Sequence, residues 1–240
     1  MIAAIIQARM GSTRLSGKVM KPLCGKPMLW HIITRLGYSK KLEKIIIATT
    51  DKEEDKIIVK FAEEMEIDYY CGSSEDVLDR YYQTSKKYNI SHIIRITADC
   101  PLVDAELVDF MVDRHMETGA DCTHNLSIFD SRMPDGTDIE VFNINALTKS
   151  WKEGSEPHHR EHVDEYIYEH PEIFKIEKVT APQWIDRPEY RLTVDYSEDF
   201  ELISKILEHF YPVQPSIREV VEFLDANQHL LDINACRRSV

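Results

Sequence analysis

The chain has 240 residues, of which 43% are hydrophobic and 30% charged, and it contains only 8 glycines and 10 prolines. This composition is typical of one folded globular domain over residues 1–240 and shows no signature of disorder. No apolar run is long enough for a membrane-spanning helix, so we expect no membrane protein. The net charge of −13 argues against a nucleic-acid binder, because phosphate contacts would have to overcome the overall repulsion.

Strand-like and helix-like segments alternate through the first half of the chain. The strand-like segments are residues 2–7, 44–50, 68–71 and 92–97. The helix-like segments are residues 27–36, 51–65, 75–88 and 104–116. Asp51 and Glu54 are spaced as a capping box at the start of the second of these helices. The alternation predicts an α/β fold with a mostly parallel sheet and helices on both faces.

The regular alternation of strand-like and helix-like segments ends after Gly119. A polar turn at Pro134–Asp138 precedes a predicted strand at 139–143, and a His-rich helix begins at Pro157. Two further predicted strands, 174–179 and 190–195, precede a helix that we expect Ser197 to cap. The remaining helix-like segments are residues 201–210 and 215–225.

The five cysteines are odd in number and form no CxxC pair, which indicates reduced thiols rather than a disulfide framework. The opening segment, MIAAIIQ, lacks the basic start and the cleavage site of a secretory signal. We therefore expect a cytoplasmic protein.

Charge is distributed unevenly along the chain. Residues 1–42 contain no Asp or Glu, and all 42 carboxylate side chains lie at Glu43 or later. The basic residues of this acid-free segment are Arg9, Arg14, Lys18, Lys21, Lys26, Arg35, Lys40 and Lys41. Transit peptides are also poor in acid, but they do not begin with a buried strand, so the pattern favours an anion-binding site.

Ligands of open α/β sheets bind beyond the carboxyl ends of the strands. Four segments with polar chemistry follow predicted strands: Gln7–Lys18, Gly72–Ser74, Ala98–Pro101 and Asp195. We expect these segments to contribute to one site.

The loop ARMGSTRLSGK, residues 8–18, has the position of a phosphate-binding loop but not the Walker A spacing. Gly11 and Gly17 enclose five residues instead of four, and Val19 follows Lys18 where Ser or Thr would hold magnesium. The dinucleotide-binding pattern Gly-x-Gly-x-x-Gly is also absent from the sequence. A solvated basic loop is the simpler alternative, but loop position, glycine spacing and missing acid together favour an anion site.

Backbone N–H groups of Gly11, Ser12 and Thr13 could face phosphate oxygens, with Arg9 and Lys18 supplying full charges. Arg14 could bind phosphate as well, or its stem could simply pack against apolar surface.

Asp99 and Asp195 each follow a predicted strand and are the candidate ligands of Mg²⁺, which prefers oxygen. Asp99 could instead cap the following helix, although Asp104 is the better-placed cap. The sequence does not establish that the two aspartates meet.

Two other motifs could have either a functional or a purely structural role. The turn at 134–138 is as consistent with a plain turn as with substrate binding. His158, His159 and His162 suggest a metal, but Glu161 is misplaced for the zincin pattern, so we expect a solvated or acceptor-contacting helix face. The sequence has no Gly-x-Ser-x-Gly elbow.

The N-terminal stretch IIQARMGSTRLSGKVMKPLCGKPML resembles the signature of the CTP-dependent cytidylyltransferases that activate acidic sugars, such as acylneuraminate and 3-deoxy-manno-octulosonate. The matching positions are Ala8, Arg9, Ser12, Arg14, Leu15 and Lys18. ITADCPLVD and LTVDYSEDF resemble the second and third family motifs. GSSEDVLDRYY and REHV are similar to the spore coat polysaccharide biosynthesis protein F branch, the branch the chain resembles most.

The resemblance implies a Rossmann-like nucleotide-diphosphosugar transferase fold and transfer of CMP from CTP to an acidic acceptor with release of pyrophosphate. It implies catalytic roles for Arg9, Lys18, Asp99 and Asp195, and a Mg²⁺ cofactor on the two aspartates. The implied nucleotide-binding residues are Ala8, Arg9, Gly11, Ser12, Thr13, Arg14, Lys18, Gly72, Ser73, Asp76, Thr97 and Ala98. The implied acceptor-binding residues are Asp135, Glu140, His159, Arg160 and His162.

Relatives of this family also suggest a homodimer, and we expect residues 120–190 to be a sub-region that binds the acceptor or mediates dimerisation. The chain departs from the family pattern at two positions: Ala98 replaces a common Gly, and Gln7 replaces the Pro of sialate and octulosonate enzymes.

Two other functions remain open from the sequence. A glycosyltransferase of the related fold would normally carry an Asp-x-Asp pair after a central strand, whereas the segment Ala98–Cys100 offers only one aspartate. A non-catalytic nucleotide-binding domain would keep the fold, but the retained Arg9, Lys18, Asp99 and Asp195 weigh against it.

Overall fold

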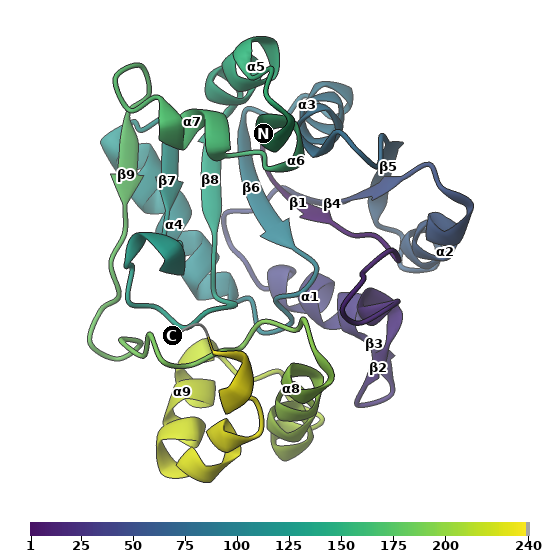
Figure 1. Cartoon of the computed structure of the whole chain (residues 1–240), viewed down its shortest axis with the longest axis vertical. Coiled ribbons are helices and arrows are strands. Elements are labelled where there is room, and N and C mark those ends of the chain that lie inside the picture. The colour runs from purple at the N-terminus through teal and green to yellow at the C-terminus, as the bar shows by residue number, and fades with distance from the viewer. Residues whose placement is uncertain (239–240) are drawn as a thin grey trace.

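The computed structural model describes residues 1–238, and its centre is a seven-stranded sheet in the order β5-β4-β1-β6-β8-β7-β9 (Figure 1). The strands are β1 (Ile2–Gln7), β4 (Lys44–Thr50), β5 (Asp68–Gly72), β6 (His92–Thr97), β7 (Cys122–His124), β8 (Glu140–Asn143) and β9 (Ile176–Lys178). Only β8 runs against the other six. The predicted α/β fold with a mostly parallel sheet is confirmed. A small hairpin, β2 (Pro22–Leu23) with β3 (Lys26–Pro27), lies outside this sheet.

Nine α-helices are present within the described residues. They are α1 (Met28–Leu36), α2 (Lys56–Glu64), α3 (Val77–Lys87), α4 (Ala105–Thr118), α5 (Ile144–Glu153), α6 (Pro157–Glu161), α7 (Glu165–Glu169), α8 (Ser197–Phe210) and α9 (Ile217–Ala226). Apolar spacing explains the buried faces: α1 buries Leu29, Ile32 and Leu36, which recur every three or four residues. Asp104 caps α4 as expected, because its carboxylate accepts the N–H of Leu107 at 3.0 Å.

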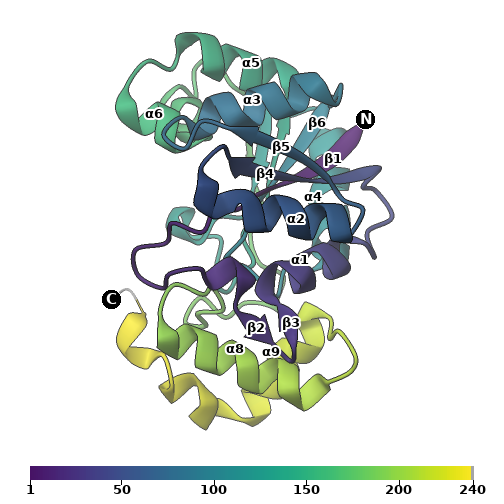
Figure 2. The ribbon, with the colours of Figure 1, turned by 90° about the vertical axis from the view of Figure 1, so that its right-hand side faces the viewer.

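The sheet separates two hydrophobic clusters. Side chains alternate along β1, so that Ala4 and Ile6 join one cluster while Ala3 and Ile5 join the other. Helices α1, α2 and α4 cover the first face, and α3, α5 and α7 contribute to the second. Figure 2 shows α3 and α5 on the opposite side of the sheet from α1, with α8 and α9 beyond α1. The fold is therefore layered, with the C-terminal helices added outside one face.

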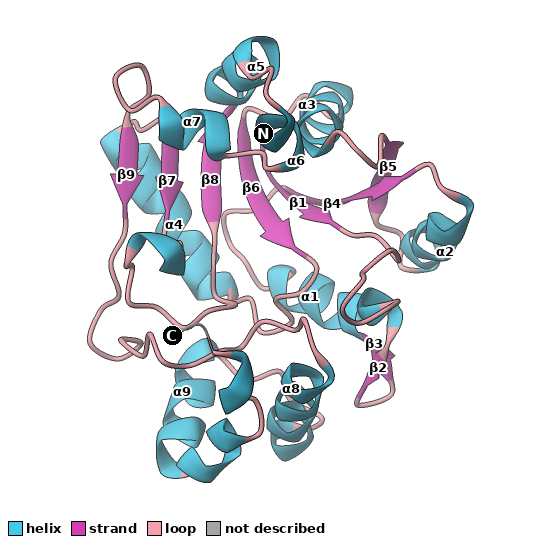
Figure 3. Cartoon of the chain, viewed as in Figure 1, coloured by secondary structure: helices cyan, strands magenta, loops and turns pink. Residues whose placement is uncertain are grey.

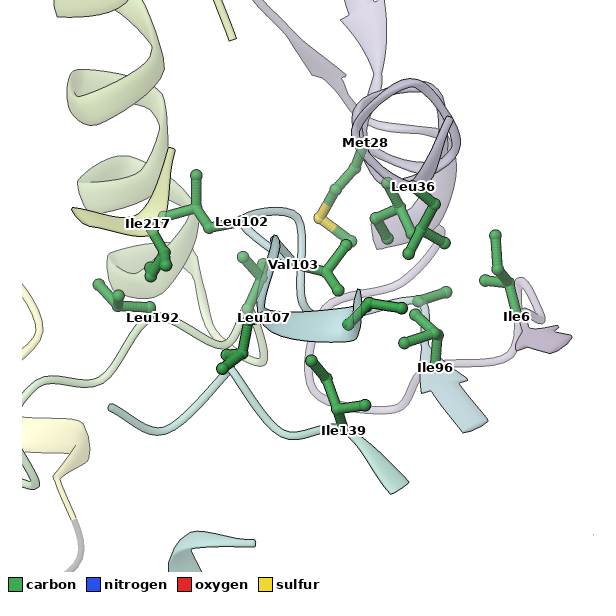
Figure 4. Close-up of a cluster of buried hydrophobic side chains, with 14 of the residues drawn as sticks. Ile6, Met28, Leu36, Ile96, Leu102, Val103, Leu107, Ile139, Leu192 and Ile217 are labelled. Atoms are coloured by element: carbon green, nitrogen blue, oxygen red, sulfur yellow. The ribbon is translucent and has the colours of Figure 1, made fainter. Parts of the chain in front are cut away.

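The first cluster ties the C-terminal helices to the sheet. Figure 4 shows Ile6 and Ile96 of the sheet near Leu36 of α1, and Leu102 near Ile217 of α9, and all five residues belong to one buried cluster. Burial of such side chains stabilises a fold by about 25 cal/mol for each Å² of apolar surface. The segment that follows β6, which includes Leu102, is therefore fixed between the sheet and α9.

The predicted strand at 190–195 is wrong. Figure 3 draws the chain between β9 and α8 as loop, and Arg191 forms only an isolated parallel bridge with Asp135. Its apolar residues Leu192 and Val194 are buried in the first cluster, so the alternation that suggested a sheet strand comes from packing beside the sheet.

Two predicted helix starts also differ. The predicted helix at 51–65 begins with a 3-10 turn at Glu53–Asp55, and α2 itself starts at Lys56 without a side-chain cap. Ser197 is the first residue of α8 and not its cap. The N–H of Tyr196 is instead accepted by the Asp199 carboxylate at 3.0 Å. The start of α8 therefore depends on the buried carboxylate of Asp199, which also contacts Arg191 and Asn234.

Residues 120–190 contain β7, β8 and β9, which extend the main sheet. Their assignment to acceptor binding or dimerisation stays a prediction. In the described part of the chain, no helix combines the length and apolar character needed to cross a membrane.

Candidate functional site

The carboxyl ends of β1 and β6 lie side by side at the centre of the sheet. The two strands are parallel neighbours with Gln7 opposite Thr97, so the loops that follow them meet. Between them lies a cavity of about 220 Å³. The residues that line it are Gln7, Arg9, Gly11, Ser12, Thr13, Arg14, Lys18, Val19, Thr97, Ala98 and Asp99. Most of the nucleotide-binding residues expected from sequence are thus brought together, and Ala8 lies buried beside them.

The loop after β1 is folded back by its own backbone. The carbonyl of Met10 accepts the N–H groups of Ser12 at 2.8 Å and of Gly17 at 3.1 Å, and Gly17 adopts a φ of 64° that favours glycine. The Ser12 N–H is therefore occupied, contrary to the expectation that it faces a ligand. The N–H groups of Gly11 and Thr13 have no hydrogen-bond acceptor within residues 1–238, so these two can serve an anion.

Asp55 anchors this loop from the neighbouring strand connection. Its carboxylate accepts the N–H of Met10 at 2.6 Å and the hydroxyl of Thr50, and the side chain is 1% exposed. Sequence reasoning missed this residue, because one acid among four near the start of a helix gives no signal for a contact 45 residues away.

Asp99 and Asp195 meet at the ammonium group of Lys18. The Lys18 Nζ donates to Asp99 Oδ2 at 3.1 Å, to Asp195 Oδ1 at 3.0 Å and to the carbonyl of Val194 at 2.7 Å. Burial alone would raise the pKa of Asp99, but the charge of Lys18 and a hydrogen bond from Thr97 hold that pKa below its usual value. Asp99 is therefore an anion at neutral pH.

Asp195 is positioned by contacts rather than by a strand. The N–H of Val194 donates to the carbonyl of Asp99 at 2.8 Å, and the N–H of Asp195 donates to Asp199 at 3.0 Å. Arg191 contacts Asp195 Oδ2 at 3.1 Å and Asp199 at 3.0 Å. Arg191, which the sequence did not single out, therefore fixes two groups: the Asp195 carboxylate and the Asp199 carboxylate that accepts the N–H of Asp195.

Of the expected acceptor-binding residues, only Asp135 belongs to this cluster. Its carboxylate contacts Arg191 at 2.7 Å, and burial raises its pKa against the opposing charge of Arg191. The adjacent Gly136 has a φ of 96°, and a Cβ there would lie 2.3 Å from the N atom of Thr193. Glycine is thus required for the loop to pass this close to the segment that carries Asp195. A second cavity of about 400 Å³ opens beside Asp135 and Arg191.

Glu140 lies away from these cavities, inside the second face of the sheet. It is 2% exposed, forms an ion pair with Arg95 and accepts the hydroxyl of Tyr168 at 3.0 Å. Burial raises its pKa despite the charge of Arg95. Its carboxylate oxygens are engaged within the fold.

Asp76 and Arg160, expected near the nucleotide and the acceptor, contact one another. Arg160 donates to Asp76 at 2.9 Å and 2.5 Å, and Asp76 also caps α3 by accepting the N–H of Asp79 at 2.8 Å. Ser73 accepts the N–H of Asp76 at 3.1 Å, and Gly72 ends edge strand β5. None of these residues lines the cavity between β1 and β6.

The histidines of α6 form a separate cluster with Glu169 of α7. His158 and His159 contact its two carboxylate oxygens at 2.8 Å and 2.6 Å. Nδ1 of His159 accepts the N–H of Glu156 at 3.3 Å, which assigns the proton to Nε2 and makes it a donor to Glu169. His162 is exposed at the end of α6, and none of the three histidines reaches the cavity.

The sequence matches a known protein family along most of its length. A family model described as Cytidylyltransferase matches residues 3–225. The chain belongs to the cytidylyltransferase family. The chain is 39% identical over 210 residues to the spore coat polysaccharide biosynthesis protein SpsF of Bacillus subtilis, and the match covers 85% of each protein.

Two further relatives extend the likeness. The chain is 27% identical over 221 residues to the 3-deoxy-manno-octulosonate cytidylyltransferase of Lawsonia intracellularis, and the match covers 88% of this chain and 83% of the relative. A cytidylyltransferase structure from Leptospira borgpetersenii superposes with a TM-score of 0.91 at 31% identity, covering 100% of this chain and 98% of that one. The family and the nucleotidyltransferase fold expected from the motifs are confirmed.

Proposed function

We propose that this cytidylyltransferase uses CTP and Mg²⁺ to transfer CMP to a small anionic, sugar-acid acceptor, releasing pyrophosphate. The observation that carries the proposal is the cavity at the ends of β1 and β6, where a cationic loop faces two converging aspartates. The names of the SpsF and octulosonate relatives support a place in the synthesis of a cell-surface or spore-coat polysaccharide.

The loop after β1 would bind the triphosphate. Arg9 is exposed at the cavity, and Gly11 and Thr13 offer N–H groups that can donate to phosphate oxygens. Arg14 and Lys18 reach the same space and would add charge-assisted hydrogen bonds. Because the first 42 residues hold no carboxylate, no acid within this segment competes for these cations.

Asp99 and Asp195 would hold the Mg²⁺. Their oxygens lie 3.1 Å and 3.0 Å from one ammonium nitrogen, so they already converge on a single positive centre, and carboxylate oxygen suits this hard cation. Bound Mg²⁺ would neutralise charge on the α-phosphate and on the departing pyrophosphate.

The residues of the chain would act by position and charge. The loop holds the triphosphate so that an acceptor oxygen attacks the α-phosphorus in line, and the fixed cations stabilise the charge that develops on the leaving group. The phosphorus–oxygen bond to the acceptor forms as the bond to pyrophosphate breaks, without an enzyme-bound intermediate. Asp135 and Arg191 border the second cavity, which we propose as the acceptor side.

Pyrophosphate release and thermal stability test this function. CTP with Mg²⁺ should raise the melting temperature more than UTP, GTP or ATP, and pyrophosphate should form with at least one member of a panel of sugar acids. Stabilisation only by a UDP- or GDP-sugar would contradict the proposal and favour a glycosyltransferase. Tight CTP binding without pyrophosphate release for any acceptor would favour a non-catalytic domain.

A further inference from the structure

The ammonium group of Lys18 uses all of its hydrogen-bonding capacity at the aspartate pair. An ammonium has three donors, and those of Lys18 are matched by Asp99, Asp195 and the carbonyl of Val194 at 2.7–3.1 Å. The side chain is 10% exposed. The backbone of Lys18 is fixed, because its N–H donates to the carbonyl of Leu15 and its carbonyl accepts the N–H of Lys21. Any change in these contacts must come from the side chain alone.

The point that Lys18 fills is also the point to which a divalent cation would bind. Magnesium–oxygen bonds are roughly 2.1 Å long, whereas Asp99 Oδ2 and Asp195 Oδ1 lie 3.1 Å and 3.0 Å from the ammonium nitrogen. The same two oxygens cannot coordinate a metal ion while they surround an ammonium of this size.

Other cations complete the neutralisation of Asp195. Arg14 contacts Oδ1 at 2.8 Å, and Arg191 contacts Oδ2 at 3.1 Å. Bringing a dication beside three positive side chains is unfavourable, because like charges repel one another strongly at these short separations. Arg191 is 11% exposed and is held by Asp135 and Asp199 as well, whereas Lys18 and Arg14 both line the cavity.

We infer that Lys18 and a divalent cation compete for Asp99 and Asp195, so that the metal binds tightly only after an incoming triphosphate has drawn Lys18 and Arg14 away. This inference rests on the proposed function, because it takes the phosphate groups of CTP as the anions that attract the two side chains. It assigns Lys18 two successive roles, first as the counter-ion of the aspartates and then as a ligand of the phosphates.

Binding of Mn²⁺ in the absence of nucleotide tests the competition without measuring activity. Mn²⁺ prefers the same oxygen ligands as Mg²⁺, and its unbound fraction is measured by electron paramagnetic resonance. Lys18→Met should bind one Mn²⁺ about tenfold more tightly than wild type, the order expected when a neighbouring positive charge is removed. Adding Asp99→Asn to the Lys18→Met variant should abolish the gain in Mn²⁺ affinity. Lys40→Met, which removes an exposed lysine of the same acid-free segment, should match wild type.

Two other variants guard against misfolding, which circular dichroism would detect. Lys18→Gln keeps a hydrogen-bond donor for the carboxylates, and Arg14→Gln changes a side chain that is 52% exposed. Both variants should gain Mn²⁺ affinity over wild type, but less than Lys18→Met does. Equal Mn²⁺ affinity for wild type and the folded Lys18 and Arg14 variants would overturn the inference. If wild type still releases pyrophosphate from CTP in that case, only the inference fails. A gain in Mn²⁺ affinity without any turnover would reject the proposed function and the role of the triphosphate, and would support only the competition between Lys18 and the metal.

Discussion

At the scale of single residues, the site depends on a few carboxylates whose partners come from distant parts of the chain. Lys18 and Asp99 could be placed near one another from sequence, because each follows a strand and parallel neighbours end at the same edge. The positions of Arg191 and Asp199 could not, since their contacts with Asp195 depend on a loop that only resembled a strand. The ion pair of Glu140 with Arg95 could not be predicted either, because the sequence does not show which face of the sheet the first residue of β8 points to.

Replacing either aspartate by asparagine should remove turnover and leave the fold intact. Asp99→Asn and Asp195→Asn each keep the shape of the side chain but lose the charge that Lys18 contacts. We expect turnover with CTP to fall by about a hundredfold or more, the effect of losing one positioned electrostatic group. Asp113→Asn, on the half-exposed face of α4, is the control. Turnover equal to wild type in either variant would remove that aspartate from the metal site.

Asp138 should make stability depend on pH. Burial and the charge of Asp135 raise its pKa from 3.8 to about 6, so the folded state binds this proton more tightly than the unfolded state. The resulting stabilisation is full below the unfolded pKa and is lost as pH rises through about 6. The Asp138→Asn variant has no carboxyl group that titrates at this position. Its free energy of unfolding should therefore fall less than that of wild type between pH 5 and 8.

Urea unfolding at several pH values measures this difference. Asp130→Asn, an exposed position in the same region, should follow the wild-type dependence. Parallel curves for Asp138→Asn and wild type would show that Asp138 titrates near its ordinary value.

At the scale of elements, the sequence predicts best where periodicity is repeated. The strands at 2–7, 44–50 and 92–97 and the helices α1, α3 and α4 appear where apolar spacing places them. Loop conformation was less accessible, because it depends on backbone contacts that leave no periodic trace. The occupied N–H of Ser12 and the anchoring of Met10 by Asp55 are examples.

The loop after β1 should become more mobile when the Asp55 carboxylate that anchors it is removed. Asp55→Ala leaves the N–H of Met10 and the hydroxyl of Thr50 without their acceptor, at a cost of about 1–3 kcal/mol for buried polar groups. The KM for CTP should rise, as measured by initial rates, and the free energy of unfolding should fall. Asp55→Asn should restore part of the KM for CTP and part of the stability, whereas Glu64→Ala, at an exposed position of α2, should change neither. An unchanged KM for CTP in Asp55→Ala would separate the anchor from nucleotide binding.

At the scale of the whole molecule, the last segment of the chain supports the centre of the site. Asn234 is fully buried and donates to the carbonyl of Arg191 at 3.0 Å and to Asp199 at 2.9 Å. These are the residues that position Asp195. The C-terminal segment therefore supports the proposed site, although it follows the last large helix and carries no recognisable motif.

Asn234→Ala should lower stability and turnover together. Loss of two buried hydrogen bonds should cost about 1–3 kcal/mol, measured by urea unfolding. The kcat with CTP should fall because Asp199 and Arg191 are less well fixed. Gln228→Ala, at an exposed position of the same segment, is the control. A loss of stability with unchanged kcat would limit the role of Asn234 to the fold.

The acid-free start of the chain has a consequence for its biosynthesis. The cationic loop emerges from the ribosome long before its counter-ions, because Asp99 follows Lys18 by 81 residues and Asp195 follows it by 177. A nascent or prematurely terminated chain that ends before Asp195 carries Arg14 and Lys18 with their charges only partly compensated. In the finished protein, Asp195 contacts Arg14 at 2.8 Å and Lys18 at 3.0 Å, so both charges are compensated within the site.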